Sequence, residues 1–398
     1  MIEYSSVDDA NPINHPSDPI MPRHIALLFA GLLGLTTSAC AESVPTAAHS
    51  VDVITVAEGL EHPWGLAFLP DGRMLVTERP GRMRVVSPDG QIDPAPIAGL
   101  PKVDAVGQGG LMDVALHPSY AENGWIYWSF AQRDSTGGNG TELARGKLAG
   151  EPGSYRMNDV ETLFRLAPKS GGGVHFGSRI VFDRDGMLYL TLGDRGDKDR
   201  AQLLDDHAGK IVRLTDRGAP APGNPFLNDT RARPEVYSLG NRNVQGAALH
   251  PETGALWAIE HGPQGGDELN LIQAGVNYGW PIITYGVNYG IGTRIGEGTE
   301  KAGLAQPVKY WTPSPAISGL AFYTGDKFPD WQGDLLIGAL RGQAVIRVQL
   351  DGDRFIADEF MLQGAVPRIR DVRVGPDGYV YLLTDLEHGA ILRLQPGA

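Results

Sequence analysis

The chain has 398 residues, of which 42% are hydrophobic and 20% charged, so it can bury a large core and is not an intrinsically disordered protein. Its formal net charge of −13 repels phosphate backbones, which excludes nucleic acid as an expected partner. A single cysteine, Cys40, excludes an internal disulfide, a zinc finger and an iron–sulfur cluster. The 53 glycines and 29 prolines favour many short strands joined by tight turns.

The N-terminal region has the features of an export signal. A short basic segment begins at Met21, an apolar run covers residues 25–35, and small residues follow up to Cys40. The run is too short to span a bilayer as a permanent helix, so residues 21–41 are predicted to be a signal peptide. Met21 is then the expected start of translation, and residues 1–20 are an extension or a mis-called start.

The end of this signal leaves two modes of processing open. Thr37-Ser38-Ala39-Cys40 resembles a bacterial lipobox, which would make Cys40 the lipidated first residue of the mature protein. The alternative is ordinary cleavage after Ala41. Residues 42–50 are expected to form a short linker. The protein is therefore expected to be exported and periplasmic, either soluble or lipid-anchored through Cys40.

After residue 50 one pattern recurs six times. Each copy has an alternating apolar strand, a turn that often contains Asp-Gly or Thr-Gly, and a second strand; the glycine supplies the positive φ of a tight hairpin. The copies occupy residues 64–78, 111–130, 177–193, 244–260, 317–339 and 369–385. Third strands follow several copies, at residues 82–86, 209–214, 344–350 and 390–394.

The repeat predicts an all-β protein, a six-bladed β-propeller of four-stranded antiparallel blades over residues 51–398. One blade cannot bury both of its faces, whereas a ring of stacked blades does. The alternatives are a pair of β-sandwiches and a parallel β-helix, but the repeat is too long for a β-helix and its hairpin turns oppose one. The segments expected between blades, where propellers carry binding chemistry, are 130–172, 193–208, 217–234 and 277–312.

His175 is the first candidate for chemistry. It follows Gly171-Gly172-Gly173-Val174 at the entry to the third repeat, and glycines allow a ligand to approach closely. A neutral histidine can abstract a proton near pH 7. The alternative is a histidine that is hydrogen-bonded within a turn.

Polar residues with an excess of arginine stand at strand ends in several repeats. Arg368 and Arg370 are two apart on one strand, so both guanidinium groups point one way. Arginines from separate blades that converge on the axis suit an anion with several carboxylates or phosphates. The alternative is a set of scattered surface salt bridges. The candidates are Gln108, Arg242, Asn243, Arg341, Arg368 and Arg370.

Segment 261–270 is rich in glycine and acidic residues. Asp267 and Glu268 add carboxylates to exposed backbone carbonyls, a mixture of oxygen donors that suits Ca²⁺. The spacing is not that of an EF-hand, and the alternative is an acidic loop capped by a turn. Trp311 is a candidate for stacking on a sugar, and its alternative role is packing between blades.

Six ordered motifs resemble those of the soluble sugar dehydrogenases that use pyrroloquinoline quinone (PQQ). This is the glucose/sorbosone dehydrogenase family, and the resemblance is to its bacterial soluble aldose sugar dehydrogenases, from about residue 59 to residue 394. The motifs occupy residues 107–111, 175–179, 240–243, 260–270, 277–281 and 368–371.

The resemblance implies a six-bladed propeller with PQQ near its axis and Ca²⁺ beside the cofactor. It implies that His175 is the catalytic base and that Arg242 assists it. The residues that it implies in contact with PQQ are Gln108, His175, Arg242, Asn243, Arg341, Arg368 and Arg370. It also implies two calcium sites, one at the backbone oxygens of Gly262 and Pro263 and one at the Glu268 carboxylate and the Tyr278 backbone oxygen.

The implied reaction is the oxidation of an aldose at its anomeric carbon to a lactone. His175 takes the hydroxyl proton, hydride passes to the quinone, and electrons then pass to an external acceptor. Two positions depart from the glucose dehydrogenase branch of the family. Arg341 stands where lysine is common, and Val174 stands where that branch has an acidic residue.

Two other functions share the predicted fold. One is a calcium-dependent propeller lactonase, and the other is a non-catalytic binding propeller of the cell envelope. Neither requires several arginines around a polyanion. The protein is expected to be a monomer or a homodimer.

Overall fold

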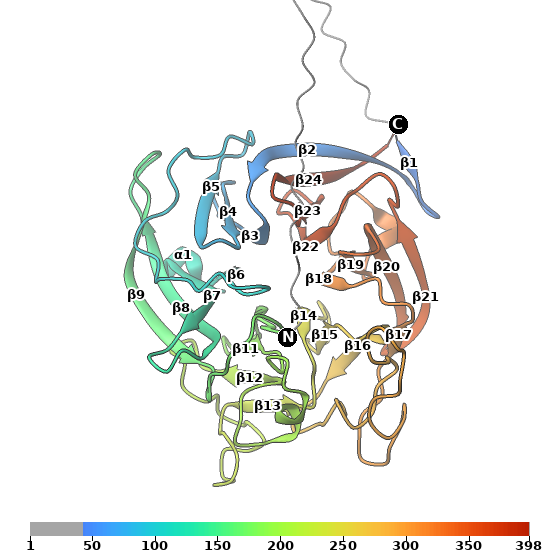
Figure 1. Cartoon of the computed structure of the whole chain (residues 1–398). Helices are drawn as coiled ribbons and strands as arrows, with labels where there is room; N and C mark the ends of the chain where they lie inside the picture. Colours follow the sequence, from blue (N-terminus) through green and yellow to red (C-terminus); the bar gives the residue numbers. More distant parts are fainter. Residues whose placement is uncertain (1–42, 398) are drawn as a thin grey trace, which may run out of the picture. The chain divides into compact units, whose positions relative to one another are not determined.

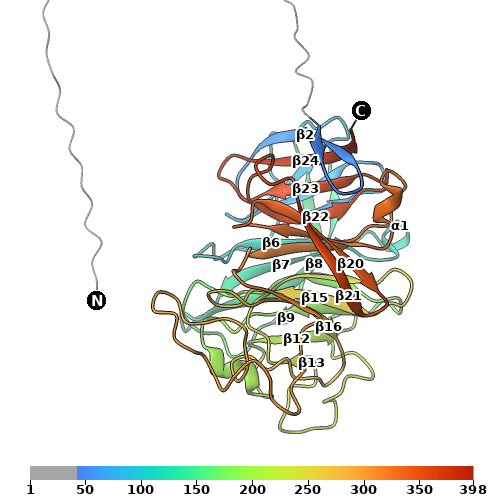
Figure 2. The same ribbon diagram turned by 90° about the vertical axis from the view of Figure 1, so that its right-hand side faces the viewer.

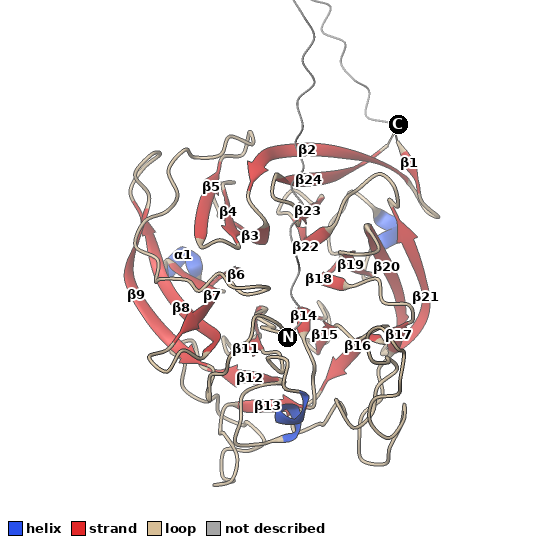
Figure 3. Cartoon of the chain, in the orientation of Figure 1, coloured by secondary structure: helices blue, strands red, loops and turns tan. Residues whose placement is uncertain are grey.

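Six antiparallel sheets surround a central axis in the structure, a computed structural model that describes residues 43–397 (Figure 1). The predicted six-bladed β-propeller is therefore confirmed. Helices in these residues are three short turns (Figure 3): α1 (Tyr120–Asn123) and the 3-10 helices η1 (Lys198–Gln202) and η2 (Pro329–Trp331). None of them is long and apolar enough to cross a membrane. The predicted extension, signal peptide and lipobox lie outside the described residues.

The blades are numbered here by the chain order of their innermost strands. Blade 1 has β3 (Pro63–Phe68), β4 (Met74–Glu78) and β5 (Arg82–Val86). Blade 2 has β6 (Leu111–Leu116), β7 (Trp125–Arg133), β8 (Asn139–Ala149) and β9 (Arg156–Arg165). Blade 3 has β10 (Ile180–Phe182), β11 (Leu188–Thr191), β12 (Lys210–Leu214) and β13 (Val236–Leu239). Blade 4 has β14 (Val244–Leu249), β15 (Leu256–Glu260), β16 (Asp267–Ile272) and β17 (Lys309–Trp311).

The last two blades complete the ring. Blade 5 has β18 (Ile317–Phe322), β19 (Leu335–Ala339), β20 (Ala344–Asp351) and β21 (Arg354–Met361). Blade 6 has β22 (Ile369–Val374), β23 (Val380–Thr384), β24 (Gly389–Pro396), β2 (Ser50–Leu60) and β1 (Val44–Pro45). Each of the six sequence copies supplies the first two strands of one blade.

Blade 6 joins the two ends of the described chain. β2 pairs antiparallel with β24, from Val51 opposite Pro396 to Leu60 opposite Gly389, and the two strands lie side by side in Figures 1 and 2. Blade 6 therefore has five strands, while blade 1 has three and the other four blades have four each. Part of the expected linker 42–50 belongs to this sheet, because β1 pairs with the start of β2.

The expectation that residues 130–172 form a segment between blades is wrong, because the segment contains two strands. Much of this segment forms β8 and β9, the outer half of blade 2. Most residues of β9 are exposed, so the strand lacks the apolar alternation that marks the inner strands. Segments 193–208 and 217–234, and 277–312 up to β17, lie outside the strands.

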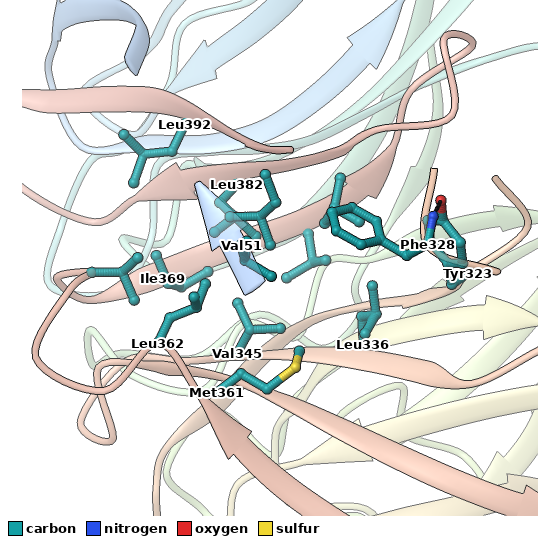
Figure 4. Packing of buried hydrophobic residues seen from close by; sticks show 14 of the residues in the cluster. Val51, Tyr323, Phe328, Leu336, Val345, Met361, Leu362, Ile369, Leu382 and Leu392 are labelled. Atoms are coloured by element: carbon teal, nitrogen blue, oxygen red, sulfur yellow. Dashed lines mark hydrogen bonds between the residues drawn. The ribbon is translucent and has the colours of Figure 1, made fainter. Parts of the chain in front are cut away.

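Apolar side chains pack at the junctions between neighbouring blades. In the described residues each of the six junctions holds its own cluster of buried side chains. Figure 4 shows the cluster between blades 5 and 6, where Val345 of β20 and Leu382 of β23 meet Val51 of β2. The hydrophobic contribution to stability is therefore distributed around the ring.

Four charged residues form an ion-pair network close to the axis. Arg179, which precedes β10, contacts the carboxylates of Asp113 at 3.0 Å and Asp371 at 2.9 Å. Arg373 contacts the same two carboxylates at 2.8 and 2.9 Å. Arg179, Asp113 and Asp371 are each at most 1% exposed. Two positive and two negative charges thus balance at the point where the blades converge.

The same carboxylates also accept backbone hydrogen bonds from neighbouring blades. Asp113 accepts from the N–H of Ile180, and Asp371 from the N–H of Leu66. The ring of Trp64 lies 4.4 Å from the Arg179 guanidinium. The network therefore joins the innermost strands of blades 1, 2, 3 and 6.

Replacing Arg179 by methionine is expected to lower the free energy of unfolding by about 3–5 kcal/mol, because two buried carboxylates lose a shared cation. Denaturant-induced unfolding measures this change. The control is Arg354→Met, which removes an exposed ion pair with Asp351 and is expected to cost less than about 1 kcal/mol. Equal losses in the two variants would contradict a stabilising role for the network.

Candidate functional site

A cavity of about 400 Å³ opens at the end of the propeller where the innermost strands begin. All six blades contribute to its wall, and this volume lies in the range of small-molecule sites. The polar and charged residues that line it are His62, Arg79, Gln108, Asn243, Gln245, His261, Arg368, Arg370 and Asp385.

A β-bulge lies where five of the six innermost strands begin. The pairing shifts register between Pro63 and Gly65, Leu111 and Val114, Val244 and Gly246, Ile317 and Leu320, and Ile369 and Asp371. A bulge bends the strand and changes the direction of a side chain. In blade 6 the bulge therefore places two consecutive side chains in different environments. Arg370 lines the cavity, whereas Asp371 belongs to the axial ion-pair network.

The opposite end of the axis carries a larger and shallower hollow of about 960 Å³. Its wall includes the other ends of the same strands, such as Phe68, Leu116 and Val374. Its charged lining residues are Asp326, Lys327, Arg373 and Asp377, and no histidine lines it. Size alone would favour this hollow, but the polar and titratable groups converge on the smaller cavity.

His175 borders the smaller cavity. Its neighbours Phe176 and Gly177 line the wall, and its backbone N–H donates to the Gln108 side-chain oxygen at 2.8 Å. The backbone of His175 is left-handed, with φ of 53°, a conformation that is uncommon outside glycine and is concentrated at functional sites. The structure therefore brings His175 and Gln108 together, as the sequence predicted.

Asp194 orients the imidazole ring. His175 Nδ1 lies 2.6 Å from Asp194 Oδ1, and this carboxylate also accepts from the indole N–H of Trp280 at 2.8 Å. Burial alone would raise the pKa of Asp194, but the hydrogen bond from His175 holds it below its ordinary value. An anionic Asp194 places the proton on Nδ1 and leaves Nε2 free to accept one.

The imidazole is held in its neutral form. Burial lowers the pKa of His175, and the charge of Arg242 acts in the same direction, while the hydrogen bond to Asp194 opposes both. The result is a pKa below the ordinary 6.5. His175 can therefore act as a base near neutral pH.

Sequence reasoning missed Asp194. The carboxylate that contacts His175 comes from the residues that follow β11. The positional signal was present, because residues just after the second strand of a repeat face this end of the propeller. Arg79, His261 and Asp385 follow β4, β15 and β23 in the same way, and all three line the cavity.

Arginines surround the cavity with little compensating negative charge. Arg370 and Arg368 contact Asp385 at 2.7 and 3.3 Å, and Asp385 is the one carboxylate among the lining residues. Burial would raise the pKa of Asp385, but the charge of Arg370 holds it well below its ordinary value. Arg79 also lines the wall, so a positive site lies within a chain of net charge −13.

Arg242 and Asn243 lie between blades 3 and 4. One Arg242 guanidinium nitrogen donates to the Gly262 carbonyl at 2.9 Å, while Nε of Arg242 is buried without a partner among the described residues. Nε of Arg370 is also buried without a hydrogen-bond partner among the described residues. Asn243 lines the cavity and accepts from the Gly177 N–H at 3.1 Å. Unpaired guanidinium N–H groups beside a positive cavity fit an acidic ligand.

Two predicted residues lie away from the cavity. Arg341 is exposed beyond the end of β19, and its neighbour Leu340 lines the wall in its place. Trp311 is 5% exposed, belongs to the apolar cluster between blades 4 and 5, and donates its indole N–H to Asp358 at 2.7 Å. The structure corrects the expectation of sugar stacking, because the Trp311 ring is used in blade packing.

The predicted calcium region contains two opposed carboxylates. Glu260 and Glu268 are register partners on β15 and β16 and line a space of about 10 Å³, together with Gly262 and Tyr278. Pro263 follows Gly262 in the same buried turn. Burial raises the pKa of Glu268, and its proximity to Glu260 raises it further.

These donors fit a hard cation. In residues 43–397 no three or more histidine, cysteine or acidic side chains are grouped so that they could hold a metal ion, so a metal here would depend on backbone carbonyls as well as carboxylates. Carboxylate and carbonyl oxygens of this kind are the ligands of Ca²⁺. A divalent cation would also relieve the repulsion between the two carboxylates.

Comparison with known proteins places the chain among sugar dehydrogenases. The glucose/sorbosone dehydrogenase family matches residues 60–393. The chain is 46% identical over 350 residues to the aldose sugar dehydrogenase YliI of Escherichia coli, covering 87% of this chain and 93% of the relative. The apo-form crystal structure of the soluble aldose sugar dehydrogenase from Escherichia coli superposes with a TM-score of 0.84 at 45% identity, covering 87% of this chain and 100% of that one.

A second solved structure is the PQQ-bound form of an aldose sugar dehydrogenase from Streptomyces coelicolor. Its TM-score is 0.73 at 33% identity, and the match covers 88% of this chain and 99% of that one. The resemblance inferred from the sequence motifs is therefore confirmed. The chain belongs to the glucose/sorbosone dehydrogenase family and is an oxidoreductase.

Proposed function

We propose that the protein oxidises aldose sugars at the anomeric carbon to lactones, with PQQ and Ca²⁺ in the axial site and an external electron acceptor. The observation that carries this proposal is the convergence of a carboxylate-oriented histidine and several arginines on one cavity. The PQQ-bound relative from Streptomyces coelicolor supports the choice of cofactor. A lactonase would instead need several acidic metal ligands in this cavity, whose wall has three arginines and one carboxylate.

The chain has suitable groups for each cofactor. PQQ carries three carboxylates and a quinone, and the residues proposed to hold it are Gln108, Arg242, Asn243, Arg368 and Arg370. Ca²⁺ beside PQQ would use the carbonyls of Gly262 and Pro263, and a second Ca²⁺ would use Glu268 and the Tyr278 carbonyl. When bound, PQQ supplies an acceptor for hydride and Ca²⁺ supplies a Lewis acid beside it.

His175 has the central proton-transfer role. The anomeric hydroxyl gives its proton to Nε2 as the hydrogen on the same carbon leaves with its electron pair. Asp194 stabilises the imidazolium that forms and keeps the ring in one orientation. Arg242, which points at the Gly262 carbonyl, is placed to balance negative charge on the same side of the cavity.

We also propose that the enzyme is exported to the periplasm. The support is the basic and apolar pattern of residues 21–41, with lipid attachment at Cys40 as one mode of retention.

Reconstitution tests the reaction class directly. The mature chain from residue 42, treated with EDTA and then given PQQ and Ca²⁺, is expected to reduce a redox dye in the presence of aldoses. Omitting either addition is expected to abolish turnover, because the arginine and carboxylate sites are then incomplete. A chain that neither binds PQQ nor turns over any aldose would overturn the proposal.

His175→Gln is expected to lower kcat by about 10²- to 10⁴-fold, because glutamine keeps polar bulk but cannot take the proton. PQQ affinity, measured by absorbance titration, is expected to change little. His388→Gln alters an exposed histidine and serves as the control, with wild-type turnover expected. Wild-type turnover in His175→Gln would remove this residue from the role of base.

Asp194→Asn is expected to lower kcat by about 10²- to 10⁴-fold, because the ring loses the acceptor that fixes its tautomer. The base works when neutral, so activity falls as pH drops through the pKa of His175. Asp194 raises that pKa, and its loss is therefore expected to move the acid limb of kcat/KM to lower pH. Asp183→Asn, which disrupts a pair with Arg213 in the same blade, should leave the profile in place. A shift to higher pH would contradict the assignment.

A further inference from the structure

Arg195 is a buried cation that the proposed reaction does not use. Its residue is 3% exposed, and among the described residues no carboxylate lies within 4 Å of its guanidinium. Burying an unpaired charge is unfavourable by several kcal/mol unless hydrogen bonds compensate for it. Burial lowers the pKa of Arg195 to about 10, which still leaves the side chain protonated at neutral pH. The position of this charge therefore requires an explanation.

The compensation comes from neutral oxygens of the segment before His175. Arg195 donates through Nη1 to the Val174 carbonyl and through Nη2 to the Gly172 carbonyl, the latter at 2.9 Å. Nη2 also donates to the side-chain oxygen of Asn139. One guanidinium thus fixes two carbonyls of the same loop against blade 2.

The ring of Phe176, the residue after His175, also packs against the Arg195 guanidinium. The Arg195 guanidinium carbon lies 3.5 Å from the centroid of the Phe176 ring, so the planar cation stacks on the residue that follows the base. The backbone N–H of Arg195 contacts the His175 carbonyl at 3.3 Å. Arg195 therefore contacts the chain on both sides of His175.

The loop needs such support because its own sequence does not specify a shape. Residues 171–173 are glycines, which have the greatest conformational freedom in the unfolded chain. His175 and Arg195 both have left-handed backbones, with φ of 53° and 61°, conformations that persist only when their surroundings enforce them. The other support is on the far side, where the Gln108 N–H donates to the Gly173 carbonyl at 2.7 Å.

We propose that Arg195 is a positioning residue, which holds the glycine loop 171–174 in the one shape that aims His175 at the cavity. It acts through the loop and touches neither sugar nor cofactor. A flexible glycine loop permits the left-handed turn, and the buried guanidinium then removes the freedom that the glycines introduce. The effect on catalysis rests on the proposed function, whereas the effect on the loop does not.

Hydrogen–deuterium exchange and kinetics together test this role. In Arg195→Gln, the amides of residues 171–175 are expected to exchange about tenfold faster or more in protein without added cofactor, since the loop loses its clamp. With PQQ and Ca²⁺, kcat is expected to fall about 10- to 100-fold, as misplacement of a reacting group by about 1 Å does. KM for the aldose and the PQQ dissociation constant are expected to stay within about threefold of wild type.

Two further variants separate positioning from folding. Arg195→Lys keeps the charge and one hydrogen bond but loses the planar fork, so partial rescue of both exchange and kcat is expected. Arg145→Gln is the matched control, because Arg145 is also a buried arginine stacked on an aromatic ring, at 4.1 Å from Trp125, but bonds Glu161 away from the cavity. It is expected to lower the melting temperature without changing kcat or exchange in 171–175.

The outcomes distinguish the two proposals. Unchanged loop exchange in Arg195→Gln would overturn the clamp, and faster exchange with wild-type kcat would show a purely structural residue and overturn the positioning role. Equal kcat losses in Arg195→Gln and Arg145→Gln would also overturn it. A third outcome is faster loop exchange in Arg195→Gln than in the wild-type protein, together with a wild-type protein that turns over no aldose. That outcome would count against the proposed function alone.

Discussion

The rest of the structure depends on the ion-pair network at the axis. Six sheets meet there, and two buried carboxylates, those of Asp113 and Asp371, lie between their first strands. Arg179 and Arg373 neutralise both, and Asp113 and Asp371 in turn accept backbone N–H groups from other blades. The charges are shared between blades, so the innermost strands of blades 1, 2, 3 and 6 cannot shift without breaking a contact of this network.

This network also forms the floor of the functional site. Asp113 follows Met112 and Asp371 follows Arg370, and the first residue of each pair lines the cavity. Trp64 lines the cavity and stacks on Arg179 below. The β-bulges at the strand starts allow one strand to serve both layers. Structural and functional residues are therefore adjacent along the chain, which explains why they occur within the same sequence motifs.

The sequence predicted those parts of the protein that have a local signal. Apolar alternation and hairpin turns, several of them with Asp-Gly or Thr-Gly, located all six inner strand pairs, and clustered arginines marked the cavity. β9 was missed because this exposed outer strand carries no apolar period. β8 is mostly buried, but glycines and charged residues interrupt its sequence, so it shows no apolar alternation either. Asp194 and Arg195 were missed because each acts on a residue about twenty positions earlier, which the β10–β11 hairpin of blade 3 brings alongside. The role of Trp311 could not be decided from the sequence, because an indole ring can either stack on a sugar or pack in a hydrophobic core.

The pairing of β2 with β24 determines the order in which folding can finish. Residues 50–60 can pair only after residues 389–396 are in place. The contact that closes the ring therefore joins segments that are far apart in the sequence, and such contacts form slowly. Until then β24 has a free edge that accepts any strand of matching sequence. The β2 strand of a second copy matches this edge as well as the chain's own β2 does. Exchange of β2 between two chains at blade 6 is therefore the natural route to a domain-swapped dimer during refolding at high concentration.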